Sequence, residues 1–93
     1  MGQVVVVGYR AQKQLRRVPR RIADKLVAWA QLVEEQGLLM VRRLPGFHDE
    51  PLKGDRKGQR SIRLSIHYRA IYTVSEGGDV EVVTVEEVTK HDY

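Results

Sequence analysis

The chain has 93 residues, no cysteine and a formal net charge of +4 at pH 7. This length suits one domain with a single modest core, and we expect residues 1–93 to form it. The absence of cysteine excludes disulfides and thiolate metal sites and agrees with a reducing compartment, so we expect a cytoplasmic protein. The apolar run VVVV at residues 4–7 is too short for a signal peptide or a membrane span, so no membrane partner is expected.

The first part of the chain predicts a strand and two helices. Residues 3–8, QVVVVG, are β-branched and end at a glycine, which indicates a buried strand. A short helix is expected at residues 11–18, because Pro19 disfavours helical geometry just before it and suits the first turn of a second helix. That helix ends near Gly37 and carries its apolar residues on one core-facing side. They are Ile22, Leu26, Trp29 and Val33.

The second part predicts a long loop and three antiparallel strands. Residues 42–60 contain two prolines, three glycines and no apolar period, and a loop of this length in a compact domain is usually functional or disordered. The strands are expected at residues 60–66, 68–74 and 80–88. The order strand, helix, helix, strand, strand, strand predicts an α+β fold, in which an N-terminal strand and a helical hairpin pack on an antiparallel sheet.

Basic residues form two clusters along the chain. Residues 10–25 hold seven of them against Asp24 alone, residues 42–69 hold eight more, and the balance reverses after Ser75. Clustered bases favour an anionic partner, either nucleic acid or an acidic protein. The alternative for each cluster is an ordinary solvated surface.

Two arginines are expected on the open face of the sheet. Apolar and polar residues alternate in residues 60–66, which places Arg63 on the polar side. Arg69 lies on the same open face as Arg63 if Ala70 and Tyr72 face the core. Two guanidinium groups beside a basic loop suit a phosphate clamp, because arginine binds phosphate oxygens bidentately. The alternative is that both arginines are structural or merely solvate the sheet.

The chain ends with His91, Asp92 and Tyr93. At a period of two, His91 and Tyr93 project to the same side of an extended strand. Histidine can take and give a proton near neutral pH, and a carboxylate such as Glu50 could complement it. From periodicity alone, a frayed terminus is the alternative.

Two stretches together resemble the bacterial RelE superfamily of toxins, in particular its HigB-like and YoeB-like branches. They are HDEPLKGDRKGQRSIRLSIHYRAIYTV at residues 48–74 and VEEVTKHDY at residues 85–93. The resemblance implies a RelE-like fold and an endoribonuclease that cuts messenger RNA, usually in the ribosomal A site. It also implies a neighbouring antitoxin, expected to be a small helix-turn-helix protein, that holds the toxin inactive.

The resemblance also implies roles for individual residues. Glu50 matches a carboxylate proposed as general base, and Arg69 matches an arginine that stabilises the phosphate. His91 and Tyr93 match terminal acid/base and orienting or stacking residues. Asp92 separates them, as in HigB-like chains, whereas YoeB-like chains end in adjacent histidine and tyrosine, so the choice of base and acid stays open. The expected RNA-binding residues are His48, Lys53, Arg56, Lys57, Arg60 and Arg63.

The expected reaction is attack of a ribose 2′-OH on the adjacent phosphate, which calls for no metal and no other cofactor. His48 is either a further participant or an ordinary loop histidine. Two other readings remain open for the whole chain. One is a ParE-like toxin, which shares the fold and poisons DNA gyrase, and the other is a non-catalytic nucleic-acid-binding module.

Overall fold

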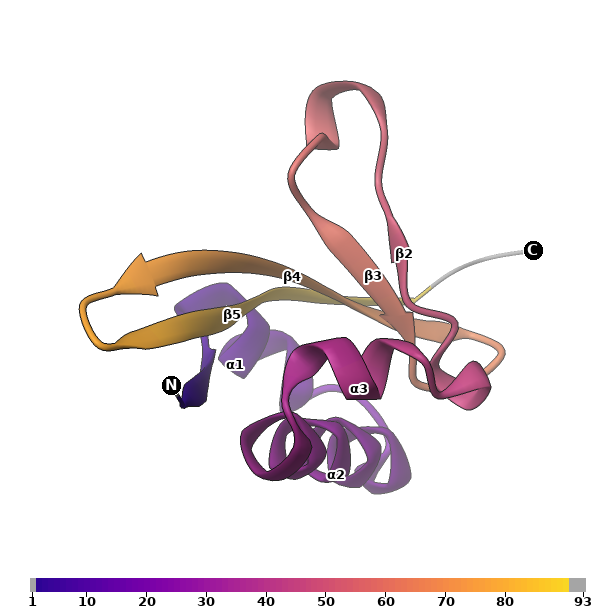
Figure 1. Cartoon of the computed structure of the whole chain (residues 1–93). Helices are drawn as coiled ribbons and strands as arrows, with labels where there is room; N and C mark the ends of the chain where they lie inside the picture. Colours follow the sequence, from indigo (N-terminus) through magenta and orange to yellow (C-terminus); the bar gives the residue numbers. More distant parts are fainter. Residues whose placement is uncertain (1, 91–93) are drawn as a thin grey trace.

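The computed structural model describes residues 2–90. In that part of the chain, five strands form one sheet in the order β1-β5-β4-β3-β2, and three α-helices pack against it (Figure 1). The helices are α1 (Tyr9–Leu15), α2 (Arg20–Gln36) and α3 (Leu38–Arg42). The strands are β1 (Gln3–Val7), β2 (Glu50–Pro51), β3 (Arg60–Arg63), β4 (Tyr68–Gly77) and β5 (Val80–Lys90). The short 3-10 turns η1 (Pro45–Phe47) and η2 (Gly54–Arg56) flank β2. This arrangement confirms the predicted α+β class.

The pairing of the strands makes the sheet mixed. The three predicted strands β3, β4 and β5 pair antiparallel, as expected. Strand β1 pairs in parallel with β5, with Val5 opposite Val83. A parallel pair needs a long crossover connection, and the intervening chain with its three helices supplies it.

Strand β1 is half-buried, so its prediction as a buried strand was wrong. Val5 and Val7 pack against the core, whereas Val4 and Val6 are exposed on the other side, because no helix covers that face of the sheet. The outer edge of β1 is instead occupied by side chains of two helices. The Val5 N–H donates to the Glu34 carboxylate at 2.9 Å, and Gln12 Nε2 donates to the Val7 carbonyl at 2.8 Å. These bonds blunt an edge that another strand could otherwise pair with.

The two predicted helices form, with shifted bounds for the first. Helix α1 spans Tyr9–Leu15 rather than residues 11–18, since residues 16–18 before Pro19 form a turn in which the Arg16 and Arg17 N–H groups bond three residues back instead of four. Helix α2 follows Pro19 and ends before Gly37, whose φ of 88° favours glycine. The predicted apolar face of α2 is confirmed, because all its members are buried in the core. They are Ile22, Leu26, Trp29 and Val33.

The strands of the second half also differ in extent from the prediction. Strand β3 ends at Arg63, and Ile66 lies in the following turn with 67% of its surface exposed. The segment at residues 42–60 was predicted as a loop, but it contains the two-residue strand β2 and the turns η1 and η2. Together β2, η2 and β3 form an arm that rises from the sheet (Figure 1).

A bulge in β5 sets which valines reach the core. The register shifts between Ile71, which pairs with Glu87, and Tyr72, which pairs with Val85. The extra residue on β5 lets Val83, Val85 and Val88 all face the helices, although strict alternation cannot place the three on one side. The bulge also puts Glu87 and Thr89 on the open face.

Candidate functional site

Strand pairing brings four distant residues into one row on the open face of the sheet. Glu50 lies opposite Ser61, Ser61 opposite Ile71, and Ile71 opposite Glu87. Directly opposed residues share a face, and this face is the one away from the helices, since the next residue on β4, Tyr72, is fully buried in the core. The row therefore crosses β2, β3, β4 and β5 above the uncovered side of the sheet.

A second row contains the predicted arginine pair. Arg63 lies opposite Arg69, and Arg69 lies opposite Thr89. Ala70 is buried in the core, which confirms that the two arginines share the open face. Like charges directly opposite each other repel, so this pair suits a site in which an anion lies between the guanidinium groups.

Both arginines keep unfilled hydrogen-bond donors. Among residues 2–90, Arg63 Nε and Arg69 Nη1 are buried and have no hydrogen-bond partner. Glu50 Oε1 lies 3.8 Å from Arg69 Nη1, which is an ion-pair distance but too long for a hydrogen bond. The Arg69 side chain is 18% exposed and lines a partly enclosed space, and Arg63 lies opposite it on the neighbouring strand.

The enclosed space is a cleft of about 380 Å³ on the open face. Its residues come from the arm, formed by β2, η2 and β3, and from the neighbouring strands β4 and β5. They are Glu50, Leu52, Arg56, Ser61, Arg69, Ile71 and Thr89. Ile71 is buried on this face, apart from the main core. The cleft thus combines an apolar surface with a carboxylate, two guanidinium groups and two hydroxyls.

The arm is tied to the sheet across one end of the cleft. Arg56 of η2 forms an ion pair with Glu87 of β5, and its Nε donates to Gln59 Oε1 at 2.7 Å. Glu87 is only 12% exposed, so Arg56 neutralises a carboxylate that would otherwise repel an anion in the cleft.

On the core side of the same strands, Asp49 forms a buried polar network. Its side chain is 1% exposed, and its Oδ1 accepts a hydrogen bond from Arg60 Nε at 2.6 Å. The Tyr72 hydroxyl donates to the other carboxylate oxygen, and Arg42 Nε donates to the Tyr72 hydroxyl at 3.3 Å. The sequence reasoning missed Asp49, because a strand of two residues leaves no alternating pattern to reveal its buried side.

The network changes the acidity of two of its members. Burial raises the pKa of Tyr72 to about 12, and the hydrogen bond to Asp49 acts in the same direction. Burial lowers the pKa of Arg60, but the hydrogen bond and charge of Asp49 outweigh it, so the pKa is raised above its usual value. Arg60, expected to bind RNA, is therefore held on the core side as a charged partner of Asp49.

The structure brings together some of the predicted site residues and separates others. Glu50, Arg56 and Arg69 line the cleft, and Arg63 lies beside it. Lys53 and Lys57 are exposed on the arm, and His48 is exposed before β2. His91 and Tyr93 lie outside the described residues. Within residues 2–90, no group of histidine, aspartate and glutamate side chains is placed to hold a metal ion.

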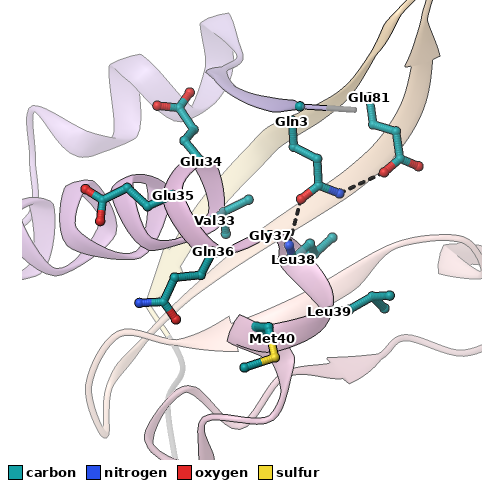
Figure 2. A pocket seen from close by; sticks show the side chains of 11 residues that line it. Gln3, Val33, Glu34, Glu35, Gln36, Gly37, Leu38, Leu39, Met40 and Glu81 are labelled. Atoms are coloured by element: carbon teal, nitrogen blue, oxygen red, sulfur yellow. Dashed lines mark hydrogen bonds between the residues drawn. The ribbon is translucent and has the colours of Figure 1, made fainter.

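A separate hollow of about 390 Å³ lies where α2, α3, β1 and β5 meet (Figure 2). Gln3 bridges these elements, because its side-chain oxygen accepts from the Leu38 N–H at 2.6 Å and its Nε2 donates to Glu81 at 2.7 Å. Glu34 and Glu35 lie along its rim. These carboxylates would repel phosphate, and the described lining includes no predicted site residue, so the hollow is not part of the candidate site.

The basic residues of α1 and α2 form an exposed surface of their own. Arg10, Lys13, Arg16, Arg17, Arg20, Arg21 and Lys25 are all exposed. A single ion pair, Arg20 with Asp24 at 4.0 Å, offsets this charge within the described part of the chain. In residues 2–90, no helix has both the length and the apolar composition to cross a membrane.

Solved structures resemble this chain over nearly its whole length. A YoeB/ParE toxin from Agrobacterium tumefaciens has a TM-score of 0.69 and 23% identity, with 96% of this chain and 99% of that chain covered. The DinJ–YafQ toxin–antitoxin complex of Escherichia coli has a TM-score of 0.74 and 18% identity, with coverages of 98% and 94%. The chain has the RelE/ParE toxin fold. The RelBE2 toxin–antitoxin complex of Mycobacterium tuberculosis matches this fold too, with a TM-score of 0.69, 21% identity and coverages of 98% and 100%.

Sequence comparison adds nothing to this structural likeness. No protein-family model matches the chain, and no curated protein matches its sequence. The likeness to solved structures therefore shows the fold and assigns no role to an individual residue.

Proposed function

We propose that the protein is the toxin of a type II toxin–antitoxin system and that it cleaves messenger RNA on the ribosome. The observation that carries the proposal is the arginine pair. Arg63 and Arg69 face each other with buried, unfilled donors, and Glu50 lies 3.8 Å from Arg69. A phosphodiester would supply the missing acceptors and place its 2′-OH beside a carboxylate. The RelE/ParE toxin fold supports the same reading.

The proposed reaction proceeds in one displacement. A base takes the proton of a ribose 2′-OH, the 2′ oxygen forms a bond to phosphorus, and the bond from phosphorus to the 5′ oxygen breaks. An acid protonates that leaving oxygen. The products are a 2′,3′-cyclic phosphate and a 5′-hydroxyl. Arg63 and Arg69 stabilise the negative charge that builds on the phosphate oxygens in the transition state.

Glu50 and His91 share the base and acid roles in this proposal. Glu50 stands at the cleft from β2, and His91 follows Thr89, a cleft residue, by two positions in the sequence. Two residues of extended chain span at most about 7 Å, so the place of His91 in the sequence is compatible with a role at the cleft. Tyr93 is proposed to stack on an unpaired base, which single-stranded RNA offers at little cost.

The arm and the antitoxin complete the proposal. Lys53 and Lys57 are exposed on the arm and contact the RNA backbone, which sets affinity rather than chemistry. The antitoxin covers the cleft and the arm with acidic side chains, since leaving Arg63 and Arg69 open would leave the RNA site open. In this proposal, the messenger RNA and the antitoxin both bind the toxin in the cytoplasm.

The test is cleavage by the purified chain on translating ribosomes, with mapping of the new RNA ends. We expect cuts with 2′,3′-cyclic phosphate ends from the natural chain, and a loss of about 10²- to 10⁴-fold in rate from Glu50→Gln. RNA binding without cleavage would instead support a non-catalytic module. Inhibition of DNA gyrase without RNA cleavage would support a ParE-like toxin, which shares this fold.

A further inference from the structure

We infer that Asp49 is a positioning residue, whose carboxylate holds strand β2 in the register that places Glu50 beside Arg69. The inference rests on the proposed function, because that function gives Glu50 its role. It concerns a buried side chain on the opposite face of the sheet from the cleft, which it does not line.

Strand β2 cannot hold its own register. It has two residues, both exposed, and Pro51 has no N–H to donate to a neighbouring strand. A slip of one residue would turn Glu50 to the other face, since side chains alternate along a strand. Something outside β2 must therefore select the observed pairing of Glu50 with Ser61.

Asp49 supplies this constraint from the core side. Its buried carboxylate is bonded to both Arg60 and Tyr72, which lie directly opposite each other on β3 and β4. Arg42 of α3 also bonds to the Tyr72 hydroxyl. A buried carboxylate without these partners is costly, so the register in which Asp49 meets both is strongly favoured.

The alternation of side chains then carries the constraint to the cleft. Asp49 and Glu50 are consecutive, so locking Asp49 on the core side directs Glu50 to the open face. His48, just before them, has a left-handed φ of 45°, a conformation that a non-glycine residue keeps only when its surroundings hold it. The buried side chains of Phe47 and Asp49 hold it from both sides.

A double-mutant cycle separates positioning from simple stabilisation. Ribosome-dependent cleavage is measured for Asp49→Asn, Glu50→Gln and the double variant. We expect Asp49→Asn to lower kcat about 10²-fold with little change in KM, because a misplacement of about 1 Å costs that much. In the Glu50→Gln background, Asp49→Asn should lower kcat hardly any further, since the carboxylate that Asp49 positions is already absent. Equal losses in both backgrounds, or no loss in either, would overturn the inference.

Amide exchange gives a readout that does not depend on activity. The Leu52 N–H donates to the Gln59 carbonyl across the arm at 2.9 Å, so its exchange reports the pairing of β2 with β3. Asp49→Asn should speed this exchange about tenfold or more. Asp79→Asn is the control, because it makes the same change in an exposed carboxylate of the β4–β5 turn and should alter neither exchange nor cleavage.

These readouts also distinguish the inference from the proposed function. Unchanged Leu52 exchange in Asp49→Asn would overturn the inference whether or not any variant cleaves RNA. If Leu52 exchanges fast in Asp49→Asn but Glu50→Gln cleaves at the full rate, Asp49 still holds the register of β2, and Glu50 has no part in the mechanism. Should Asp49→Asn not fold, Tyr72→Phe replaces it in the test, because it removes one hydrogen bond to Asp49 and keeps the ion pair with Arg60. We expect Tyr72→Phe to speed Leu52 exchange and to lower kcat only where Glu50 is present, with a smaller loss of kcat than Asp49→Asn.

Discussion

Arg63 and Arg69 lie directly opposite each other on β3 and β4, on the face of the sheet that no helix covers. Each keeps a buried guanidinium nitrogen without a hydrogen-bond partner among residues 2–90. Two unfilled cationic donors on directly opposed residues favour an anion between them, because it would both fill the donors and reduce the repulsion. The predictions below follow from this site and from the network beneath it.

Arg69→Ala should lower kcat for RNA cleavage by about 10²- to 10³-fold, with a smaller change in KM, because the arginine acts mainly on transition-state charge. Arg69→Lys is the matched comparison, since it keeps the charge but loses the two-pronged geometry. We expect it to recover part of the lost rate. Steady-state kinetics on translating ribosomes measures both, and a variant whose defect lies wholly in KM would assign Arg69 to binding alone.

Ending the chain at Lys90 should abolish most cleavage while leaving the fold intact. The buried contacts of β5 come from Val83, Val85 and Val88, which the truncation keeps. Loss of His91 alone should cost about 10²- to 10⁴-fold in rate. Melting temperature, ribosome binding and mRNA cleavage are compared for the two chains. Equal cleavage by both would show that the terminal residues do no chemistry.

Lys53→Ala and Lys57→Ala should weaken binding to RNA without a matching loss of kcat, because both lysines are exposed on the arm and do not line the cleft. Each substitution should lower the slope of log affinity against log salt concentration by about one. Titrations of single-stranded RNA at several salt concentrations measure the slope. An unchanged slope in the double variant would place the RNA elsewhere on the protein.

The network at Asp49 predicts a loss of stability in alkaline solution. Burial and the Asp49 bond raise the pKa of Tyr72 to about 12, above the value of about 10 for an unfolded tyrosine. A phenol that holds its proton more tightly in the folded state contributes stability that is complete below pH ~10 and lost as the pH rises through ~12. The free energy of unfolding should therefore fall across this window.

Tyr72→Phe isolates this contribution, because it removes only this phenol and leaves every other side chain unchanged. At neutral pH the variant should be less stable by about 1–3 kcal/mol, since the buried Asp49 loses a hydrogen bond. Between pH ~10 and ~12 its stability should fall less steeply than that of the natural chain. Urea denaturation at a series of pH values measures both curves, and parallel curves would contradict the prediction.

Local patterns in the sequence were enough for the buried face and the end of α2 and for the face shared by the arginine pair, but they did not predict α3 or the bounds of α1. The apolar spacing of α2 from Ile22 to Val33 predicted its buried face, and Gly37 predicted its end, because both follow from the geometry of one helix. The alternation around Arg63 and Arg69 likewise predicted which face they share. Such patterns work in a regular helix or strand, because the face of a side chain there follows from its place in that element.

Only the folded chain shows which elements meet and which polar groups lose water. The parallel pairing of β1 with β5, the bulge that turns Val88 to the core, and the two-residue strand β2 all depend on partners distant in sequence. Burial of Asp49 and the approach of Glu50 to Arg69 depend on them as well. A strand of two residues has no period to read, and a carboxylate in a polar loop looks the same in sequence whether it faces water or the core. Its role is decided by the arginine and tyrosine that neighbouring strands place against it.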